Sequence, residues 1–289
     1  MPNAAELLSE GLRAERAGAL ERALESYRAV ANATTDPDAR AEALTREASV
    51  HRTRCNWDDA LKAARTAQDI ARRAALSQRL AEAVVAEANV LICQGKFDIA
   101  IPKLEWLALN ENPRVRGIAL QNLGSIRAES GQLGAAERAF SESLGNFHKA
   151  GYARGEAIAL NNLGRLALDS NDAKRARPLL ERSLNLGRDV QDSELTALAS
   201  LNLAWALCSE GDLDRAQDFA MAALGYFADC NNSWREIECL RLIGDINRQS
   251  ENVDDAARCY DVALKLAEQI GSDTEVRTTR ERIAALGRR

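Results

Sequence analysis

Apolar residues recur along the chain at the three- and four-residue intervals that are typical of amphipathic helices. The stretch ALNNLGRLAL, residues 159–168, keeps this spacing, although its middle contains Asn161, Asn162 and Gly164, which are poor helix formers. A small residue returns every 40 residues, at Gly124, Gly164, Ala204 and Gly244. A fixed period of this kind predicts a chain built from structural repeats.

An alanine stands twelve residues after each small residue. Its positions are Ala23, Ala60, Ala100, Ala136, Ala176, Ala216 and Ala256. The first three of these alanines belong with Gly11, Ala48 and Ala88, so the sequence divides into seven units. Successive alanines are 37, 40, 36, 40, 40 and 40 residues apart, and the repeat therefore covers nearly the whole chain.

Each unit is predicted to form two antiparallel helices joined by a tight turn. The chain breaks five residues before each alanine, at Gly18, Cys55, Gly95, Gly131, Asn171, Gly211 and Glu251. Gly or Asn at such a break permits a positive φ, while the small residue and the alanine let the two helices approach closely. Acidic residues that follow the break, such as Asp58 and Asp98, suit the first turn of the second helix. Pro102 and Pro178 are expected in or near that same turn.

These features resemble the tetratricopeptide repeat, whose pattern combines a bulky apolar residue, a Leu-Gly pair, a Gly turn, an Ala and an aromatic residue. The fourth unit meets it at Leu120, Leu123, Gly124, Gly131, Ala136 and Phe140, and the seventh at Leu240, Ile243, Gly244, Ala256, Tyr260 and Ala263. The second and third units depart from it with Glu47-Ala48 and Glu87-Ala88. The 40-residue period is similar to the lengthened repeats of kinesin light chains, spindle-orientation adaptors and bacterial peptide-pheromone receptors. The resemblance implies an all-α fold, a right-handed superhelical α-solenoid of about seven helix pairs plus a C-terminal capping helix.

We expect one continuous array over residues 1–289, because repeat units contact only their neighbours and share one core. The predicted repeats cover about 4–36, 41–76, 79–110, 114–150, 153–190, 193–230 and 233–271, and the capping helix covers 273–287. The apolar stripe of this cap is Val276, Ile283 and Leu286. Its arginines, expected to face mostly outward, are Arg277, Arg280 and Arg282.

The composition favours a helical array in the cytoplasm. Hydrophobic residues make up 46% of the chain but aromatic residues only 4%, a mixture that packs helices rather than strands. No apolar run approaches the roughly 20 residues that span a bilayer, and the N-terminus lacks the order of a signal peptide. We therefore expect a cytoplasmic protein without a membrane partner. Lysine supplies 6 of the 38 basic residues, which suggests a GC-rich bacterial genome.

No group of residues in the sequence indicates catalysis or metal binding. The six cysteines include no CxxC pair, His51 and His148 are isolated, and no Gly-rich phosphate loop, GxSxG or HExxH occurs. The thiols are expected to pack as small hydrophobes. A net charge of −5 argues against a nucleic-acid partner. The sequence thus predicts a non-enzymatic protein without cofactor or metal, and it leaves the oligomeric state open.

In proteins of this family the first helices of the repeats line the concave face of the array. The resemblance therefore places the binding surface on those helices. Asn122, Asn162 and Asn202 occupy equivalent positions on that face in three consecutive units. An Asn amide offers two donors and an acceptor, which match the backbone of an extended peptide. The other residues expected to contact the ligand are Gln121, Asn161, Arg165, Trp205, Arg241 and Arg248.

Arginine presents a fork that fits a carboxylate, and tryptophan is a common anchor at binding interfaces. We therefore predict a protein scaffold or adaptor that holds a partner protein or an extended peptide. The preferred ligand carries acidic residues or a free carboxylate near the C-terminal repeats. A second hypothesis is a ligand-responsive sensor that acts through a partner protein.

Structural roles compete with these assignments. Asn122, Asn162 and Asn202 form a ladder with one residue in each repeat. Any of them can instead hydrogen-bond a neighbouring helix and hold the repeats in register without any ligand. Arg46 and Arg52 are expected to be solvated or paired with Glu42. Trp57, Trp106 and Trp234 are expected to fill the core.

Overall fold

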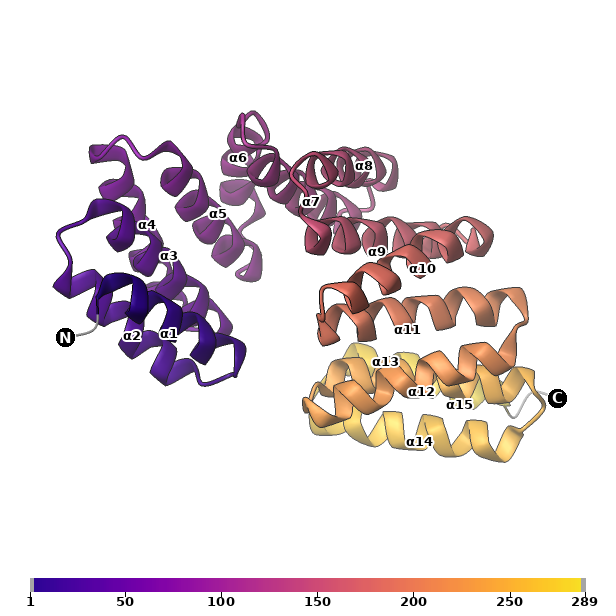
Figure 1. Ribbon diagram of the computed structural model, residues 1–289. Helices are drawn as coiled ribbons and strands as arrows, with labels where there is room; N and C mark the ends of the chain where they lie inside the picture. The colour runs from indigo at the N-terminus through magenta and orange to yellow at the C-terminus, as the bar shows by residue number, and fades with distance from the viewer. Residues whose placement is uncertain (1–2, 287–289) are drawn as a thin grey trace. The chain divides into compact units, whose positions relative to one another are not determined.

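The computed structural model describes residues 3–286, which form fifteen α-helices and no strand (Figure 1). The helices are α1 (Ala4–Arg16), α2 (Leu20–Ala33), α3 (Pro37–Thr53), α4 (Trp57–Arg73), α5 (Ser77–Cys93), α6 (Phe97–Ala108), α7 (Pro113–Glu129), α8 (Leu133–Lys149), α9 (Ala153–Asp169), α10 (Ala173–Asp189), α11 (Ser193–Glu210), α12 (Leu213–Asp229), α13 (Ser233–Gln249), α14 (Val253–Gln269) and α15 (Asp273–Leu286). Odd-numbered helices from α1 to α13 are the first helices of the predicted repeats, and even-numbered helices are the second. The all-α class is confirmed, and Gly287, the predicted last residue of the cap, lies outside the described residues.

The turns inside the repeats fall where the sequence breaks. All seven predicted break positions have a positive φ, including three that are not glycine: Cys55 at 57°, Asn171 at 57° and Glu251 at 63°. The turns between repeats use the same conformation at Ala75, Gln191 and other positions. Ala75 and Gln191 carry no glycine signal, so the sequence alone did not mark these two turns, whereas Gly151 and Gly271 carry one.

Each glycine late in a first helix faces a large side chain sixteen residues further on. A Cβ on Gly124 would lie 2.6 Å from the ring of Phe140, and one on Gly244 would lie 2.4 Å from the ring of Tyr260. Gly11 meets Tyr27 in the same way, and Gly164 meets Leu180. The glycines therefore make room for side chains of the second helix, whereas the sequence suggested close backbone contact.

The second and third repeats replace the leucine of the Leu-Gly pair with a charged residue that the fold neutralises. The side chain of Glu87 is only 3% exposed. Its carboxylate lies 2.9 Å from Arg65 Nε, 2.9 Å from Gln68 Nε2 and 2.8 Å from Lys103 Nζ. In the preceding repeat, Glu47 accepts a hydrogen bond from Arg28 Nε at 2.9 Å. The departures from the family pattern are thus compensated by cations on the neighbouring second helices.

Two expectations are wrong, one about the prolines and one about the tryptophans. Pro102 and Pro178 are each the sixth residue of their helix, α6 and α10, so each removes an amide hydrogen beyond the first turn. Trp106 and Trp234 do not fill the core, because they are 49% and 57% exposed. Trp57 opens α4 in a half-buried position.

The helices pack into two compact units that divide between Ala150 and Gly151. We call them the N-terminal unit, with α1 to α8, and the C-terminal unit, with α9 to α15. Each has apolar clusters of its own, which are Ala-rich and sit between successive helices. None of the described helices is both long and apolar enough to cross a membrane.

Helix α15 closes the C-terminal unit with ion pairs as well as apolar contacts. Arg282 Nε donates to Asp245 Oδ2 on α13 at 3.1 Å, and Glu275 pairs with Arg241 of the same helix. The expectation that Arg282 faces outward is therefore wrong, whereas Arg277 and Arg280 are exposed. Val276 packs on the cluster around Ile237, as expected for the apolar stripe of a cap.

Candidate functional site

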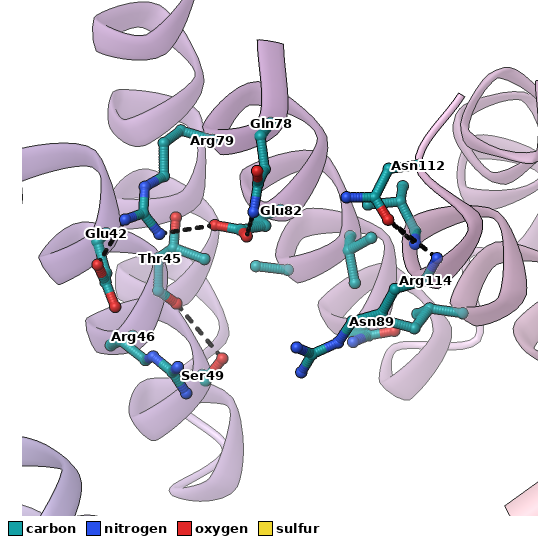
Figure 2. A pocket seen from close by; sticks show the side chains of 14 residues that line it. Glu42, Thr45, Arg46, Ser49, Gln78, Arg79, Glu82, Asn89, Asn112 and Arg114 are labelled. Atoms are coloured by element: carbon teal, nitrogen blue, oxygen red, sulfur yellow. Dashed lines mark hydrogen bonds and ion pairs between the residues drawn. The ribbon is translucent and has the colours of Figure 1, made fainter. Parts of the chain in front are cut away.

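The first helices of three consecutive repeats enclose a polar pocket in the N-terminal unit. Its volume is about 240 Å³, and its lining comes from α3, α5, α7 and the N-cap residue that precedes α7 (Figure 2). Arg79 and Glu82 enter from α5, Glu42 and Arg46 from α3, and Asn112 from the start of α7. Within this unit, the first helices therefore form a hollowed surface, as expected for the binding face of such repeats.

One side of the pocket is held by an arginine surrounded by three carboxylates. Arg79 donates to Asp38 through Nε at 3.0 Å and through Nη2 at 2.8 Å. The same guanidinium contacts Glu42 at 2.7 Å and Glu82 at 3.0 Å. The hydrogen bond from Arg79 holds the pKa of Asp38 below its ordinary value, against the opposing effect of burial. This network ties α3 to α5, and it corrects the expectation that Glu42 pairs with Arg46 or Arg52.

Asparagine amides join neighbouring first helices in both units. Asn122 Nδ2 donates to Asn89 Oδ1 at 2.7 Å between α7 and α5, and Asn202 Nδ2 donates to Asn161 Oδ1 at 2.9 Å between α11 and α9. Asn161 and Asn202 are almost fully buried. Asn162, by contrast, is half-buried and has no hydrogen-bond partner among the described residues. Two members of the predicted ladder thus hold repeats together, while Asn162 keeps its amide available.

The arginines predicted to bind the ligand are partly engaged within the C-terminal unit. Arg165 pairs with Asp169 at 3.2 Å and reaches Glu238 of α13 at 3.2 Å. Arg241 is mostly buried and pairs with Glu275 of α15. Arg248 is exposed at the end of α13. Arg165 and Arg248 are thus both exposed, whereas Arg241 is mostly buried.

The remaining predicted contacts also lie on first helices. Trp205 is half-buried and packs against the apolar cluster of the C-terminal unit. The Oε1 atom of Gln121 is buried without a hydrogen-bond partner. Their placement on first helices agrees with the predicted binding face, and their role as ligand contacts stays a prediction.

Sequence reasoning missed the pocket of the N-terminal unit. Most of its residues on α3 and α5 occupy the same repeat positions as the predicted ligand contacts, so the register contained the signal. The second and third units lack the Leu-Gly pair and the recurring asparagine, however, so the sequence pattern there is weaker than in the later repeats. The ion pairs of Arg79 join residues up to 41 positions apart, a distance at which sequence spacing gives no geometry.

Comparison with known proteins agrees with the helix pairs. Residues 115–189 and 155–229 each match the tetratricopeptide repeat family model. Residues 115–229 are thus tetratricopeptide repeats, and the resemblance is confirmed over these residues. No curated protein matches the chain.

Several solved structures share the fold at low sequence identity. The apo quorum sensor NprR from B. thuringiensis has a TM-score of 0.69 and 13% identity, over 91% of this chain and 76% of that one. A Rap protein complexed with Competence and Sporulation Factor has a TM-score of 0.68 and 16% identity, over 93% and 76%. Aspartyl phosphate phosphatase F from Bacillus subtilis has a TM-score of 0.66 and 15% identity, over 94% and 71%. At these identities the likeness concerns the fold.

Proposed function

We propose that the protein is a non-enzymatic scaffold that holds a partner protein or an extended peptide on the first helices of its repeats. The observation that carries this proposal is the polar lining of those helices, where amides and arginines stand at the positions that face a hollowed surface in the N-terminal unit. Such groups match the donors and acceptors of a peptide backbone. Function in a repeat fold is decided by this surface rather than by the helices behind it.

The proposal includes the ligand's chemistry and the protein's setting. A ligand with acidic residues or a free carboxylate fits the arginines of the first helices, among which Arg165 and Arg248 are exposed in the C-terminal unit. The six cysteines are all free thiols, which suits the reducing cytoplasm of a bacterial cell. The proposal requires no cofactor, metal or nucleic acid.

A second candidate function is a sensor that changes its interaction with a partner when a ligand binds. The observation that favours it is the division of the helices into two compact units, since a ligand that prefers one arrangement of such units shifts their equilibrium. Two proteins of similar fold are described as a quorum sensor and as a complex with Competence and Sporulation Factor. Compaction on ligand binding, measured by small-angle scattering, separates the sensor from a passive scaffold.

The scaffold proposal is tested with a library of random hexapeptides passed over immobilised protein. Asn162→Ala is expected to weaken the best retained peptide by about 1–2 kcal/mol, because it removes an amide that has no partner in the fold. Its melting temperature should change little. Asn247→Ala is the matched control, since the Asn247 amide bonds only the carbonyl of Ile243 in its own helix.

Two results contradict the scaffold proposal. The first is that the wild-type protein retains no peptide from the library. The second is that Asn162→Ala lowers the melting temperature but leaves affinity unchanged, which would assign this amide to the fold alone.

A further inference from the structure

Helix α6 is apolar on two opposite faces. One face is buried against α5 and α7, the two helices that α6 contacts among the described residues, and it carries Ala100, Leu104 and Leu107. The other face is exposed and carries Ile99, Pro102, Trp106 and the C-cap residue Leu109. These four residues, which we call the outer stripe, are three or four positions apart and therefore lie on one side of the helix. Ile99, Trp106 and Leu109 are three of the eight exposed large hydrophobic side chains among residues 3–286, so such side chains are concentrated here.

The neighbouring second helices are polar where α6 is apolar. Counted from the first residue of each helix, the outer stripe corresponds in α4 to four exposed residues, Asp59, Lys62, Thr66 and Asp69. In α8, Arg138 and Glu142 stand at the positions of Pro102 and Trp106. The repeat itself therefore does not require apolar residues at these positions. An exposed apolar stripe that the fold does not need is typical of a protein interface.

The two edges of the outer stripe differ in charge. One edge carries Asp98 and Glu105, whose exposed carboxylates have no hydrogen bond or ion pair within the described part of the chain. The other edge carries Lys103 and Asn110. Lys103 contacts Glu87 at 2.8 Å, and its ammonium group has three hydrogens to share. Asn110 Oδ1 accepts from a backbone amide at 2.9 Å, which leaves its NH₂ group as a donor.

We propose that α6 pairs in parallel with α6 of a second copy of this chain, around a two-fold axis along the helices. In a parallel pair each edge residue faces the residue five positions later on the other helix. Asp98 of one copy then faces Lys103 of the second copy, and Glu105 faces the amide of Asn110. The two-fold axis forms each contact twice.

The edge charges favour a second copy in this one orientation. The face is complementary to itself in a parallel pair, because an acidic edge meets a donor edge on both sides. An antiparallel pair would bring Asp98 and Glu105 of both copies together, and like charges at an interface oppose association. The pairing uses a second helix only, so it goes beyond the proposed function and leaves the first helices of both copies free.

Sedimentation velocity of the full chain over a range of concentrations tests the pairing. The wild-type is expected to form a dimer that dissociates at micromolar concentrations, since one short helix buries less than the roughly 1,200 Å² of a stable interface. Trp106→Glu should weaken the dimer by about tenfold or more, because it replaces the largest side chain of the stripe with a charge. Thr66→Glu, at the equivalent exposed position of α4, is the matched control and should leave the dimer unchanged. Both positions are exposed, and thermal melting checks that both variants fold.

Two further variants test the orientation. Asp98→Lys should weaken the dimer by about threefold or more, because it places a lysine opposite Lys103 of the second copy. Asp58→Lys, the equivalent change on α4, should have no effect. In a parallel pair Ile99 lies against its own copy, so Ile99→Cys should give a cross-linked dimer under mild oxidation. The wild-type protein, which has exposed thiols of its own, is the control for that reaction.

The outcomes that overturn the pairing are distinct. A wild-type protein that stays monomeric at every concentration overturns it, and the stripe would then belong to a different protein. A dimer that persists unchanged in Trp106→Glu excludes α6 as the interface. A dimer in which Ile99→Cys gives no more cross-linking than the wild-type overturns the parallel orientation. Peptide retention by Trp106→Glu should equal that of the wild-type, so the scaffold proposal stands or falls separately.

Discussion

At the scale of single residues, small residues of the first helices leave space for larger side chains of the second helices. Gly124, Gly164 and Gly244 leave space that Phe140, Leu180 and Tyr260 fill. At the equivalent place in the sixth repeat, Ala204 is accompanied sixteen residues later by the small Ala220, and both are buried. A glycine in the middle of a helix costs roughly 1 kcal/mol, and the packed ring or leucine offsets this cost.

We predict that Gly124→Ala destabilises the protein by about 1–3 kcal/mol, because the new methyl group collides with the ring of Phe140 in a closely packed interior. The measurement is the free energy of unfolding in urea. Gly145→Ala on α8 is the matched control, since a Cβ there meets no atom within 4 Å. The control should be neutral or stabilising by up to about 1 kcal/mol. Equal losses in both variants would show that the ring of Phe140 is not the cause.

At the scale of the helix, buried charge replaces apolar packing in the second and third repeats. Glu87 sits on α5 between α4 and α6, from which Arg65, Gln68 and Lys103 reach its carboxylate. Burial by itself raises the pKa of Glu87, but the hydrogen bonds from these three residues outweigh it, and the pKa lies below its ordinary value. A carboxylate with a lowered pKa in the folded state stabilises the protein above its unfolded pKa, and this contribution is lost as the pH falls through the folded pKa.

We predict that Glu87→Gln lowers the free energy of unfolding at pH 7 by about 1–3 kcal/mol, since it removes the charge that Arg65 and Lys103 share. The wild-type should lose stability below about pH 4.3, and the variant should lose less over the same range. Urea titrations between pH 3 and pH 7 measure both effects. Glu105→Gln, at an exposed position of α6, should follow the wild-type curve. Parallel curves for the wild-type and Glu87→Gln would contradict this assignment.

At the scale of the molecule, the helices form two units that each have their own apolar clusters. Stability in repeat proteins is close to a sum of neighbouring interfaces, so damage spreads mainly to adjacent repeats. We therefore expect adjacent repeats to open together while distant repeats stay closed, a difference that hydrogen exchange can measure.

We predict that Gly124→Ala accelerates hydrogen exchange of amides in α7 and α8 more than in α11 and α12. The physical reason is that the strained contact with Phe140 lies inside the N-terminal unit. Exchange mass spectrometry of the wild-type and the variant measures the difference. A uniform acceleration across both units would show that the chain opens as a single cooperative body.

Much of the fold was predictable because its determinants are local. Helix spacing, the seven breaks and the small residues act within one helix or one turn, and the structure has a positive φ at every predicted break. The candidate site was predictable only in part. Its register on the first helices follows from the repeat, but the engagement of Arg165 with Glu238 joins residues 73 positions apart. The exposure of Trp106 and Trp234 likewise depends on which neighbouring helix covers them.

The sequence by itself determined the paired helices, their turns and the positions that face the hollowed side, because a 40-residue period repeats short-range constraints on packing and backbone angle. Only the tertiary structure decided which polar groups on that side remain available. Arg79 is ion-paired with carboxylates of α3 and α5, whereas Arg46 has no ion pair among the described residues. Asn202 donates to Asn161, whereas Asn162 has no hydrogen-bond partner among them. The physical reason is that a hydrogen bond or ion pair depends on distances between helices, which a periodic sequence pattern does not contain.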